Sequence, residues 1–589
     1  QFLSVRGGIL TDVVYMVDGL PMSSGMIGDN FTNIANTAVQ QLRVLAGGFN
    51  AEYGEAHSIV DIVTKDPTGP LTGTITYRMR PAGKYHWGRY FYSDELYDHT
   101  HFDLEYWTNH DGGYPELTPE ERLAKWREFV GNPDPIMGDY INRMEWETQG
   151  TISGGITKKL GFMLSGKYKE GVNTYPQAQP YNPEWYGQLK LTYKISPSMK
   201  LTLNGLFGGY DNAGAARSFF SSTETVAGSY EERGINQENM QITHAYAYNK
   251  YFPFAYPFRG SKEEMQMNNI ALDWTHTLSP STFYNVKLSR LDERLLFDVA
   301  DNERFLSQYP DELDWWRFRR NYVMDVKHFD SLAGFPGYNH YSNSEIYTLK
   351  ADITSQINNL NQVKAGLLFK RYTLDYYNFR LFFTQNYREN HLHKFYSHPY
   401  EGAFYLQDKL EFGGMVINAG LRLDYYHPGC KAYKYFFDPH SVLLETPGHD
   451  ENDPEYIWPG YDNEQLVDVP IRYAISPRLG FSHPITDKTI LHFSYGHFNK
   501  RPSWFKMQRG SYMFYSGDFL VNDPPHLDAN GMPVPHATYM NRYAHSLDNG
   551  NPLLGFEKMI SYEIGFDQEI AGKFRLDATM YYKELKHQT

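Results

Sequence analysis

The sequence of 589 residues has a single cysteine, Cys430, so a disulfide framework within the chain is excluded. We interpret Cys430 as an incidental loop residue. Long hydrophobic runs are also missing, because none approaches the roughly 18 residues that a membrane-spanning helix needs. The mean hydropathy is low, at -0.57. Basic residues are outnumbered, with 55 Lys and Arg against 69 Asp and Glu, for a net charge of -14. Nucleic-acid-binding domains are usually basic, so nucleic acid is not an expected partner.

Motifs of common catalytic and metal sites are missing as well. The sequence contains no G-x-S-x-G nucleophile elbow, no phosphate-binding loop and no H-E-x-x-H zinc motif. His391, His393 and His398 lie close together, but no further ligand follows at a recognisable spacing. The acidic residues from Asp450 to Asp453 favour an ordinary solvated loop over a calcium site. We therefore predict a protein that is not an enzyme and has no metal or cofactor.

Aromatic residues, by contrast, are abundant and make up 16% of the sequence. Tyr and Trp gather at both membrane–water boundaries of membrane β-barrels. Beyond residue 70, apolar and polar residues alternate in many segments. In one of them, Leu189, Leu191 and Tyr193 alternate with Lys190 and Thr192. A period of two with one charged face predicts strands with lipid on one side and a polar interior on the other.

These alternating segments occur in pairs that are joined by a few turn residues. Long polar insertions separate one pair from the next. Short turns on one side and long loops on the other are typical of outer-membrane barrels. A soluble antiparallel sheet, half buried against a core, is the alternative, and it does not explain this asymmetry. About fifteen strands are predicted: 71–80, 143–156, 160–169, 185–195, 199–210, 265–278, 282–291, 343–357, 362–377, 401–412, 415–426, 471–483, 489–498, 560–570 and 574–585.

The stretch from Val39 to Pro67 contains two short apolar strands around a glycine turn and an aromatic-acidic turn. Two short motifs, R-G-G and D-G-L-P, precede it. Together they resemble the second half of the plug domain of TonB-dependent outer-membrane receptors. The run A-E-Y-G-x(4)-V-x-I-V-T-K is the most specific part of the resemblance. The residues that match the plug motifs are Arg6, Gly7, Gly8, Asp18, Gly19, Pro21, Gly47, Gly48, Glu52, Tyr53 and Gly54.

The C-terminal half is similar to the barrel of the same family, in the runs A-I-S-P-R-L-G-F from Ala474 and Y-E-I-G-F from Tyr562. The resemblance implies a mainly β protein, a transmembrane antiparallel β-barrel with a small α/β plug in its lumen. Residues 1–67 would be the second half of the plug, and residues 68–589 the barrel with its long extracellular loops. Since the family barrel has about twenty-two strands, we expect a fragment of a longer protein that lacks both ends.

The resemblance also implies a function. The chain would be an outer-membrane receptor of a Gram-negative bacterium, surrounded by outer-membrane lipid. It would bind a siderophore, glycan or peptide on its loops and plug, and import it when the TonB complex of the inner membrane displaces the plug. The turn G-G-F-N-A-E-Y-G resembles the branch that carries an extra N-terminal carboxypeptidase-regulatory-like β-sandwich, and the resemblance adds a surface lipoprotein as a candidate partner. The alternatives are a non-transporting structural or docking barrel subunit of a larger complex and a passive porin.

Specific contacts follow from the same resemblance. Many family members have an arginine where this chain has Ala46, and that arginine pairs the plug with barrel carboxylates. Here Arg6 with Glu563, on the polar face of its strand, is the candidate plug–barrel pair. Dense aromatic clusters in the loops are candidate ligand-binding residues, because exposed aromatic rings stack on sugars or anchor proteins. Packing between loops is the alternative. These candidates are Tyr248, Tyr251, Phe252, Trp315 and Trp316.

Overall fold

The computed structural model of the protein describes part of the chain. The described residues are 13–26, 34–45, 50–54, 58–83, 103–109, 116–130, 142–172, 181–213, 261–299, 338–383, 388–433, 466–508, 518–519, 526–527, 533–534, 550–570 and 572–587.

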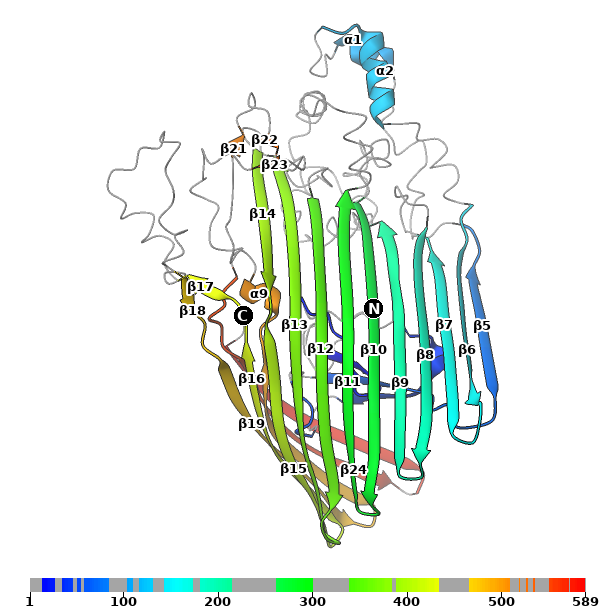
Figure 1. Ribbon diagram of the computed structural model, residues 1–589, viewed down its shortest axis with the longest axis vertical. Helices are drawn as coiled ribbons and strands as arrows, with labels where there is room; N and C mark the ends of the chain where they lie inside the picture. The colour runs from blue at the N-terminus through cyan, green and yellow to red at the C-terminus, as the bar shows by residue number, and fades with distance from the viewer. Residues whose placement is uncertain are drawn as a thin grey trace, which may run out of the picture.

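A large, curved antiparallel sheet forms the wall of a barrel, and its strands stand side by side in Figure 1. Within the described residues, sixteen long strands form the wall. They occupy fifteen places around it, because β14 and β15 pair with successive parts of the same strand, β13, and so share one place. This confirms the predicted mainly β barrel fold. The strands are β5 (Thr72–Arg80), β6 (Glu145–Gly155), β7 (Leu160–Gly171), β8 (Asn182–Ser196), β9 (Met199–Ala213), β10 (Ser261–Ser279), β11 (Thr282–Val299), β12 (Tyr338–Gln356), β13 (Asn361–Phe383), β14 (Arg388–Ser397), β15 (Tyr400–Phe412), β16 (Met415–His427), β19 (Arg472–Thr486), β20 (Thr489–Lys500), β24 (Glu557–Ile570) and β25 (Phe574–Lys586).

Several wall strands are longer than the sequence pattern indicates. Residues 378–400 fall between two predicted strands, 362–377 and 401–412, where the sequence pattern predicts a loop, and this prediction is wrong. Strand β13 has 23 residues, and its last ten pair with β14 in an antiparallel register from Leu374–Ser397 to Phe383–Arg388. A membrane-spanning strand needs only about 9–11 residues. The hairpin of β13 and β14 is therefore longer than a membrane crossing requires. Pairing between the two strands satisfies the backbone N–H and C=O groups along the extra length.

The two faces of the wall differ in polarity as predicted. In β24, Tyr562, Ile564 and Phe566 are exposed on the outer face, whereas Ser561 and Glu563 are buried on the inner face. The same alternation places Leu189 and Tyr193 outside and Lys190 inside. Buried polar side chains normally have hydrogen-bond partners. The partners of this inner face must therefore come from the wall itself or from residues inside the barrel.

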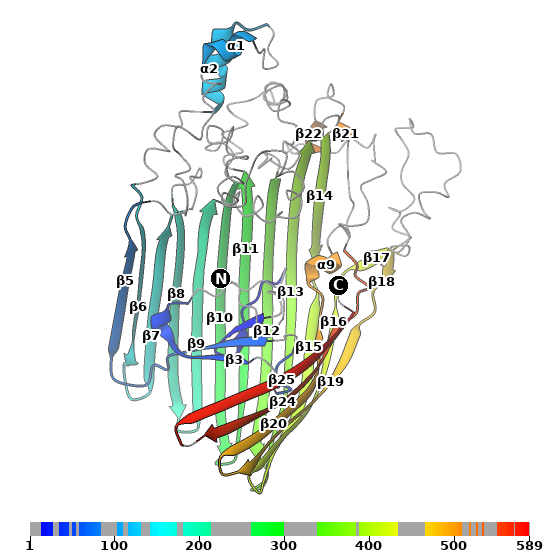
Figure 2. The same ribbon diagram turned by 180° about the vertical axis from the view of Figure 1, so that it is seen from behind.

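A small sheet crosses the interior of the barrel. Its strand order is β2-β1-β4-β3, with β1 (Val13–Val17), β2 (Leu20–Pro21), β3 (Val39–Leu45) and β4 (Ser58–Thr64). Strands β1 and β4 are parallel, and the other two pairs are antiparallel. Figures 1 and 2 show these strands, in blue, at mid-height within the wall. We refer to the described residues between 13 and 64 as the inner sheet. The short 3-10 helix η2 (Asn36–Ala38) precedes β3.

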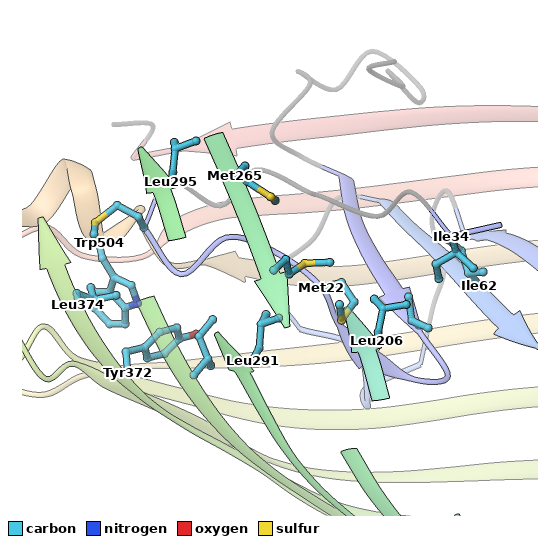
Figure 3. Packing of buried hydrophobic residues seen from close by; sticks show 14 of the residues in the cluster. Met22, Ile34, Ile62, Leu206, Met265, Leu291, Leu295, Tyr372, Leu374 and Trp504 are labelled. Atoms are coloured by element: carbon cyan, nitrogen blue, oxygen red, sulfur yellow. The ribbon is translucent and has the colours of Figure 1, made fainter. Parts of the chain in front are cut away.

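An apolar cluster joins the inner sheet to the wall. Met22 and Ile62 lie in the same cluster as Leu206 and Leu291, which belong to the wall strands β9 and β11. Figure 3 shows these side chains together with Tyr372 and Trp504. Burial of such side chains contributes about 1.5–3 kcal/mol each. The inner sheet is thus held by apolar packing as well as by the polar contacts described below.

The described helices are short, and the remaining strands are small. They are α1 (Leu104–Asn109), α2 (Pro119–Val130), α9 (Trp504–Gln508), β17 (Lys431–Tyr433), β18 (Leu466–Asp468), β21 (Asp518–Phe519), β22 (His526–Leu527) and β23 (Pro533–Val534). The amide of Thr118 donates to Glu121 at 2.8 Å, and the amide of Glu121 donates to Thr118 Oγ1 at 3.3 Å. These two bonds form a capping box at the start of α2. Within the ranges given above, no helix has the length and apolar character needed to cross a membrane.

Candidate functional site

The first contact between the inner sheet and the wall is made by the turn at Asp18 and Gly19. Both residues have positive φ angles, 49° and 81°, as a tight two-residue hairpin turn requires. Oδ1 of Asp18 accepts the Thr64 amide at 2.9 Å, and Oδ2 accepts the Thr64 hydroxyl at 2.7 Å. The same carboxylate connects β1 to β4, and its position at the end of the sheet leaves it free to reach the wall.

Three wall strands bind this turn. Lys190 of β8 and Asn204 of β9 donate to Oδ2 of Asp18 at 3.2 and 3.1 Å. Lys287 of β11 donates to the Asp18 carbonyl at 2.6 Å. A Cβ at Gly19 would lie 3.2 Å from Nζ of Lys287. The turn therefore needs glycine both for its φ angle and for the approach of this lysine.

The second contact is the turn from Asn50 to Gly54, which contains the A-E-Y-G motif. Nη1 of Arg478, on β19, donates to the Asn50 carbonyl at 2.5 Å. Nη1 of Arg422, on β16, donates to the carbonyls of Ala51 and Glu52 at 3.2 and 3.1 Å. Arg422 is only 2% exposed, and its Nε pairs with Asp424 at 2.7 Å. Two buried guanidinium groups thus bind the backbone of one turn.

Glu52 adds a side-chain connection at the same turn. Its carboxylate pairs with Lys364 of β13, and the same ammonium pairs with Asp352 of β12 at 2.8 Å. All three side chains are at most 20% exposed. An ion pair that is largely shielded from water is strong when its geometry is complete and costly to break by removal of one partner. Lys364 therefore bridges a carboxylate of the inner sheet and a carboxylate of the wall.

Gly54 and Tyr53 complete the turn. A Cβ at Gly54 would lie 2.6 Å from Nη2 of Arg422, so only glycine admits the guanidinium at this distance. Burial raises the pKa of the Tyr53 phenol, and the neighbouring Glu52 carboxylate raises it further. The phenol consequently stays protonated at neutral pH.

Six predicted motif residues lie at these two turns or beside them. Asp18, Gly19, Glu52 and Gly54 contact or closely approach the wall, and Tyr53 and Pro21 border the cavity described below. Glu563 lies on the inner face of β24 and is buried. The other predicted residues lie outside the described ranges, so the Arg6–Glu563 pair and the aromatic candidates stay predictions. These residues are Arg6, Gly7, Gly8, Gly47, Gly48, Tyr248, Tyr251, Phe252, Trp315 and Trp316.

The wall cations that bind these turns were not predicted as site residues. Lys190 was recognised only as a residue of the polar face, and Lys287, Lys364, Arg422 and Arg478 were not singled out. Their signal in the sequence is a cation at an inner-face position of an alternating strand. That signal does not say which cation meets which turn, because the residues of each contact are more than 170 positions apart.

A cavity of about 470 Å³ lies between the inner sheet and the wall. One side is formed by the inner sheet at Met16, Ser23–Met26 and Glu52–Gly54. The other is formed by β11, β12, β13, the segment 500–506, Arg422 of β16 and the ends of β24 and β25 at Glu557–Lys558 and Leu585–Lys586. This volume is within the range of about 300–1,000 Å³ that is usual for small-molecule sites. In the described part of the chain, no group of three or more His, Cys, Asp or Glu side chains is arranged to hold a metal ion.

The architecture defines a class of protein, a β-barrel with a small mixed sheet bound across its interior. The family described as TonB dependent receptor-like, beta-barrel, matches residues 193–589, and this chain belongs to that family. No curated protein matches the sequence.

Solved structures show the same fold at low sequence identity. The siderophore receptor PirA of Pseudomonas aeruginosa matches with a TM-score of 0.53 at 14% identity over 99% of this chain and 68% of that receptor. PirA of Acinetobacter baumannii matches with a TM-score of 0.54 at 12% identity, over 98% and 63%. The ferric enterobactin receptor PfeA of Pseudomonas aeruginosa matches with a TM-score of 0.51 at 13% identity, over 98% and 64%. The chain thus spans 63 to 68% of the length of these receptors.

Proposed function

We propose that the chain is part of an outer-membrane receptor of a Gram-negative bacterium, which binds a ligand and imports it when the TonB complex displaces the inner sheet. Residues 1–67 are then plug and residues 68–589 barrel. The observation that carries this proposal is the cavity of about 470 Å³ bounded by both the inner sheet and the wall. A ligand in that space would contact the element whose movement opens the barrel, so binding and passage would be coupled.

The contacts between the inner sheet and the wall are non-covalent, so they hold the sheet in place and can still be broken. Hydrogen bonds and ion pairs at Asp18 and at Asn50–Glu52 connect it to the wall, and no disulfide is involved, because the chain has one cysteine. Work is needed to break such contacts. The outer membrane has no nucleotide supply and little usable ion gradient, so this work would come mechanically from TonB in the inner membrane.

Relatives suggest the range of ligands without defining this one. PirA is a siderophore receptor and PfeA a ferric enterobactin receptor. Function in such folds depends on the residues of the site rather than on the fold. The ligand of this chain could be a siderophore, a glycan or a peptide, and the aromatic loop residues predicted above would contribute to binding it.

A reversible lock on the inner sheet tests the proposal. The hydroxyls of Thr37, in η2, and Thr151, in β6, are 2.8 Å apart. In a Cys430→Ser background, Thr37→Cys with Thr151→Cys should form a disulfide between the inner sheet and the wall. We expect oxidation to abolish TonB-dependent uptake of whichever labelled ferric siderophore, oligosaccharide or peptide the unlocked protein imports, and reduction to restore it.

A matched disulfide within the wall serves as the control. The hydroxyls of Thr282 and Ser355, on β11 and β12, are 2.7 Å apart, so Thr282→Cys with Ser355→Cys joins two wall strands only. This variant should import normally when oxidised. Uptake that persists in the locked protein, or in cells without TonB, would contradict the proposal. A barrel that imports none of these ligands and purifies with partner subunits would favour the docking function instead.

A further inference from the structure

The cavity between the inner sheet and the wall is lined unevenly in charge, although the chain as a whole carries a net charge of -14. Among the described residues, eight cationic side chains line it, against two carboxylates, Glu52 and Glu557. The cations are Lys350, Lys370, Arg422, Lys500, Arg501, Lys506, Lys558 and Lys586. A cleft with one sign of charge and low-dielectric walls concentrates the electric field and raises the local concentration of counter-ions.

Carboxylates outside the lining pair with several of these cations. Lys370 and Arg501 both pair with Glu401, at 2.8 and 2.7 Å. Arg422 pairs with Asp424 at 2.7 Å, and Lys586 with Glu584 at 3.0 Å. Lys350 is not among the cations of these pairs.

Lys350 is the most informative of these cations. It lies on the inner face of β12, is only 8% exposed and stands directly opposite Lys287 of β11 in the strand register. Among the described residues, no carboxylate lies within ion-pair distance of its ammonium group. The carboxylates of Glu52 and Asp352 are both bridged by Lys364. A buried ammonium group without a direct counter-charge is costly to maintain, and an anion in the cavity would remove that cost.

An aromatic surface borders the same space. Trp504, which is fully buried, lies in α9, with the Arg501 guanidinium 3.8 Å above its ring and the edge of Tyr372 at a centroid distance of 5.4 Å. Its indole nitrogen is buried without a hydrogen-bond acceptor in the described part of the chain. Buried donors normally have partners. A ligand that brings acceptor oxygens beside this ring would satisfy both the donor and the neighbouring cations.

We propose that this cavity binds a small polyanion, a molecule with two or more carboxylate, phosphate or sulfonate groups, and that Lys350 is its central anion-binding residue. The proposal deepens the receptor function proposed above and rests on it for its physiological meaning. A neutral glycan or peptide of the same size would leave Lys350 without a direct counter-charge, so the cavity discriminates against it by charge.

Binding to the purified full chain in detergent tests the proposal without TonB. The probe is benzene-1,3,5-tricarboxylate, and its trimethyl ester has the same ring without the charges. By isothermal titration calorimetry, we expect the trianion to bind at least about tenfold more tightly than the ester, because only the trianion offers the cations a counter-charge. Its affinity should fall as salt rises from about 50 to about 500 mM.

Variants at Lys350 assign the effect to this site. Lys350→Met should weaken trianion binding by about tenfold or more, whereas Lys350→Arg, which keeps the charge, should retain it within about threefold. Lys488→Met, at an exposed turn between β19 and β20, is the matched control and should bind as the parent protein does. Circular dichroism and heat-modifiable gel mobility establish that each variant is folded.

Several results would overturn the proposal: undetectable trianion binding, equal affinity for trianion and ester, or a folded Lys350→Met variant that binds normally. Failure of the receptor function has a different signature, since it concerns uptake in cells. Trianion binding by the purified chain together with TonB-independent uptake would contradict the proposed function and leave the cavity assignment standing.

Discussion

Gly54 of the inner sheet and Arg422 of the wall approach so closely that a Cβ on the glycine would lie 2.6 Å from Nη2 of the arginine. The arginine is buried, donates to the carbonyls of Ala51 and Glu52, and is fixed by Asp424. The smallest residue of the A-E-Y-G motif thus provides space for the cation that holds the turn.

Substitution of Gly54 should therefore loosen the inner sheet. We expect Gly54→Ala to lower the free energy of opening of residues 58–64, measured by hydrogen exchange, by about 1–3 kcal/mol, because the guanidinium must move. Gly69→Ala is the control, since no heavy atom lies within 4 Å of a Cβ there. Equal exchange in the two variants would show that the close approach has no energetic consequence.

Removal of the bridging lysine should have a larger effect. Lys364→Met leaves Glu52 and Asp352 close together without their shared cation, and breaking a buried pair in this way costs about 3–5 kcal/mol. Exchange in β4 should quicken, and cells carrying the variant should become more permeable to vancomycin. Lys409→Met disrupts the exposed Lys409–Glu411 pair and should change stability by less than about 1 kcal/mol. Similar results for both lysines would rule out the bridge as an anchor.

Asp61 makes the stability of the inner sheet depend on pH. Burial raises the pKa of its carboxyl, Arg43 opposes this, and Asp18 adds to it. The folded state therefore binds the proton more tightly than the unfolded state. This contribution to stability is complete below the unfolded pKa of 3.8 and is lost as pH rises through the higher folded pKa.

The Asp61→Asn variant isolates this contribution, because other carboxylates titrate in both proteins. We expect the variant to be more stable than the parent at neutral pH, with the difference narrowing as pH falls through the folded pKa. This stability difference is measured as the free energy of opening from hydrogen exchange, corrected for the intrinsic exchange rate at each pH. A difference that does not vary with pH would contradict the assignment.

Cys430 should be unreactive in the folded protein. The thiol is buried, and burial raises its pKa to about 12 from an ordinary value of 9.0. Since the thiolate is the reactive form, its population near pH 8 is about a thousandfold lower than for an ordinary thiol. Labelling with a maleimide should be slow in detergent and rapid after full denaturation. Fast labelling of the folded chain would show that this segment opens readily.

Much of the wall could be predicted from local patterns. Alternation at Leu189–Lys190 and at Tyr562–Glu563 correctly assigned the outer and inner faces, and the turn at Gly413–Gly414 has the positive φ angles, 55° and 82°, of a tight hairpin. The inner turn at Asp18–Gly19 was equally visible, because Asp and Gly tolerate that conformation. The hairpin of β13 and β14 was missed, because its polar, aromatic sequence resembles a loop until its backbone pairing is seen.

The sequence by itself determined which residues form strands, which side of each strand is polar and where tight turns occur, because these properties depend on neighbours a few positions away. Only the tertiary structure decided that Lys364 meets Glu52, that Arg422 meets Gly54 and that cations from the wall and from the segment 500–506 enclose one cavity. Those contacts join residues hundreds of positions apart, and the curvature and register of the closed wall, rather than any local pattern, bring them together.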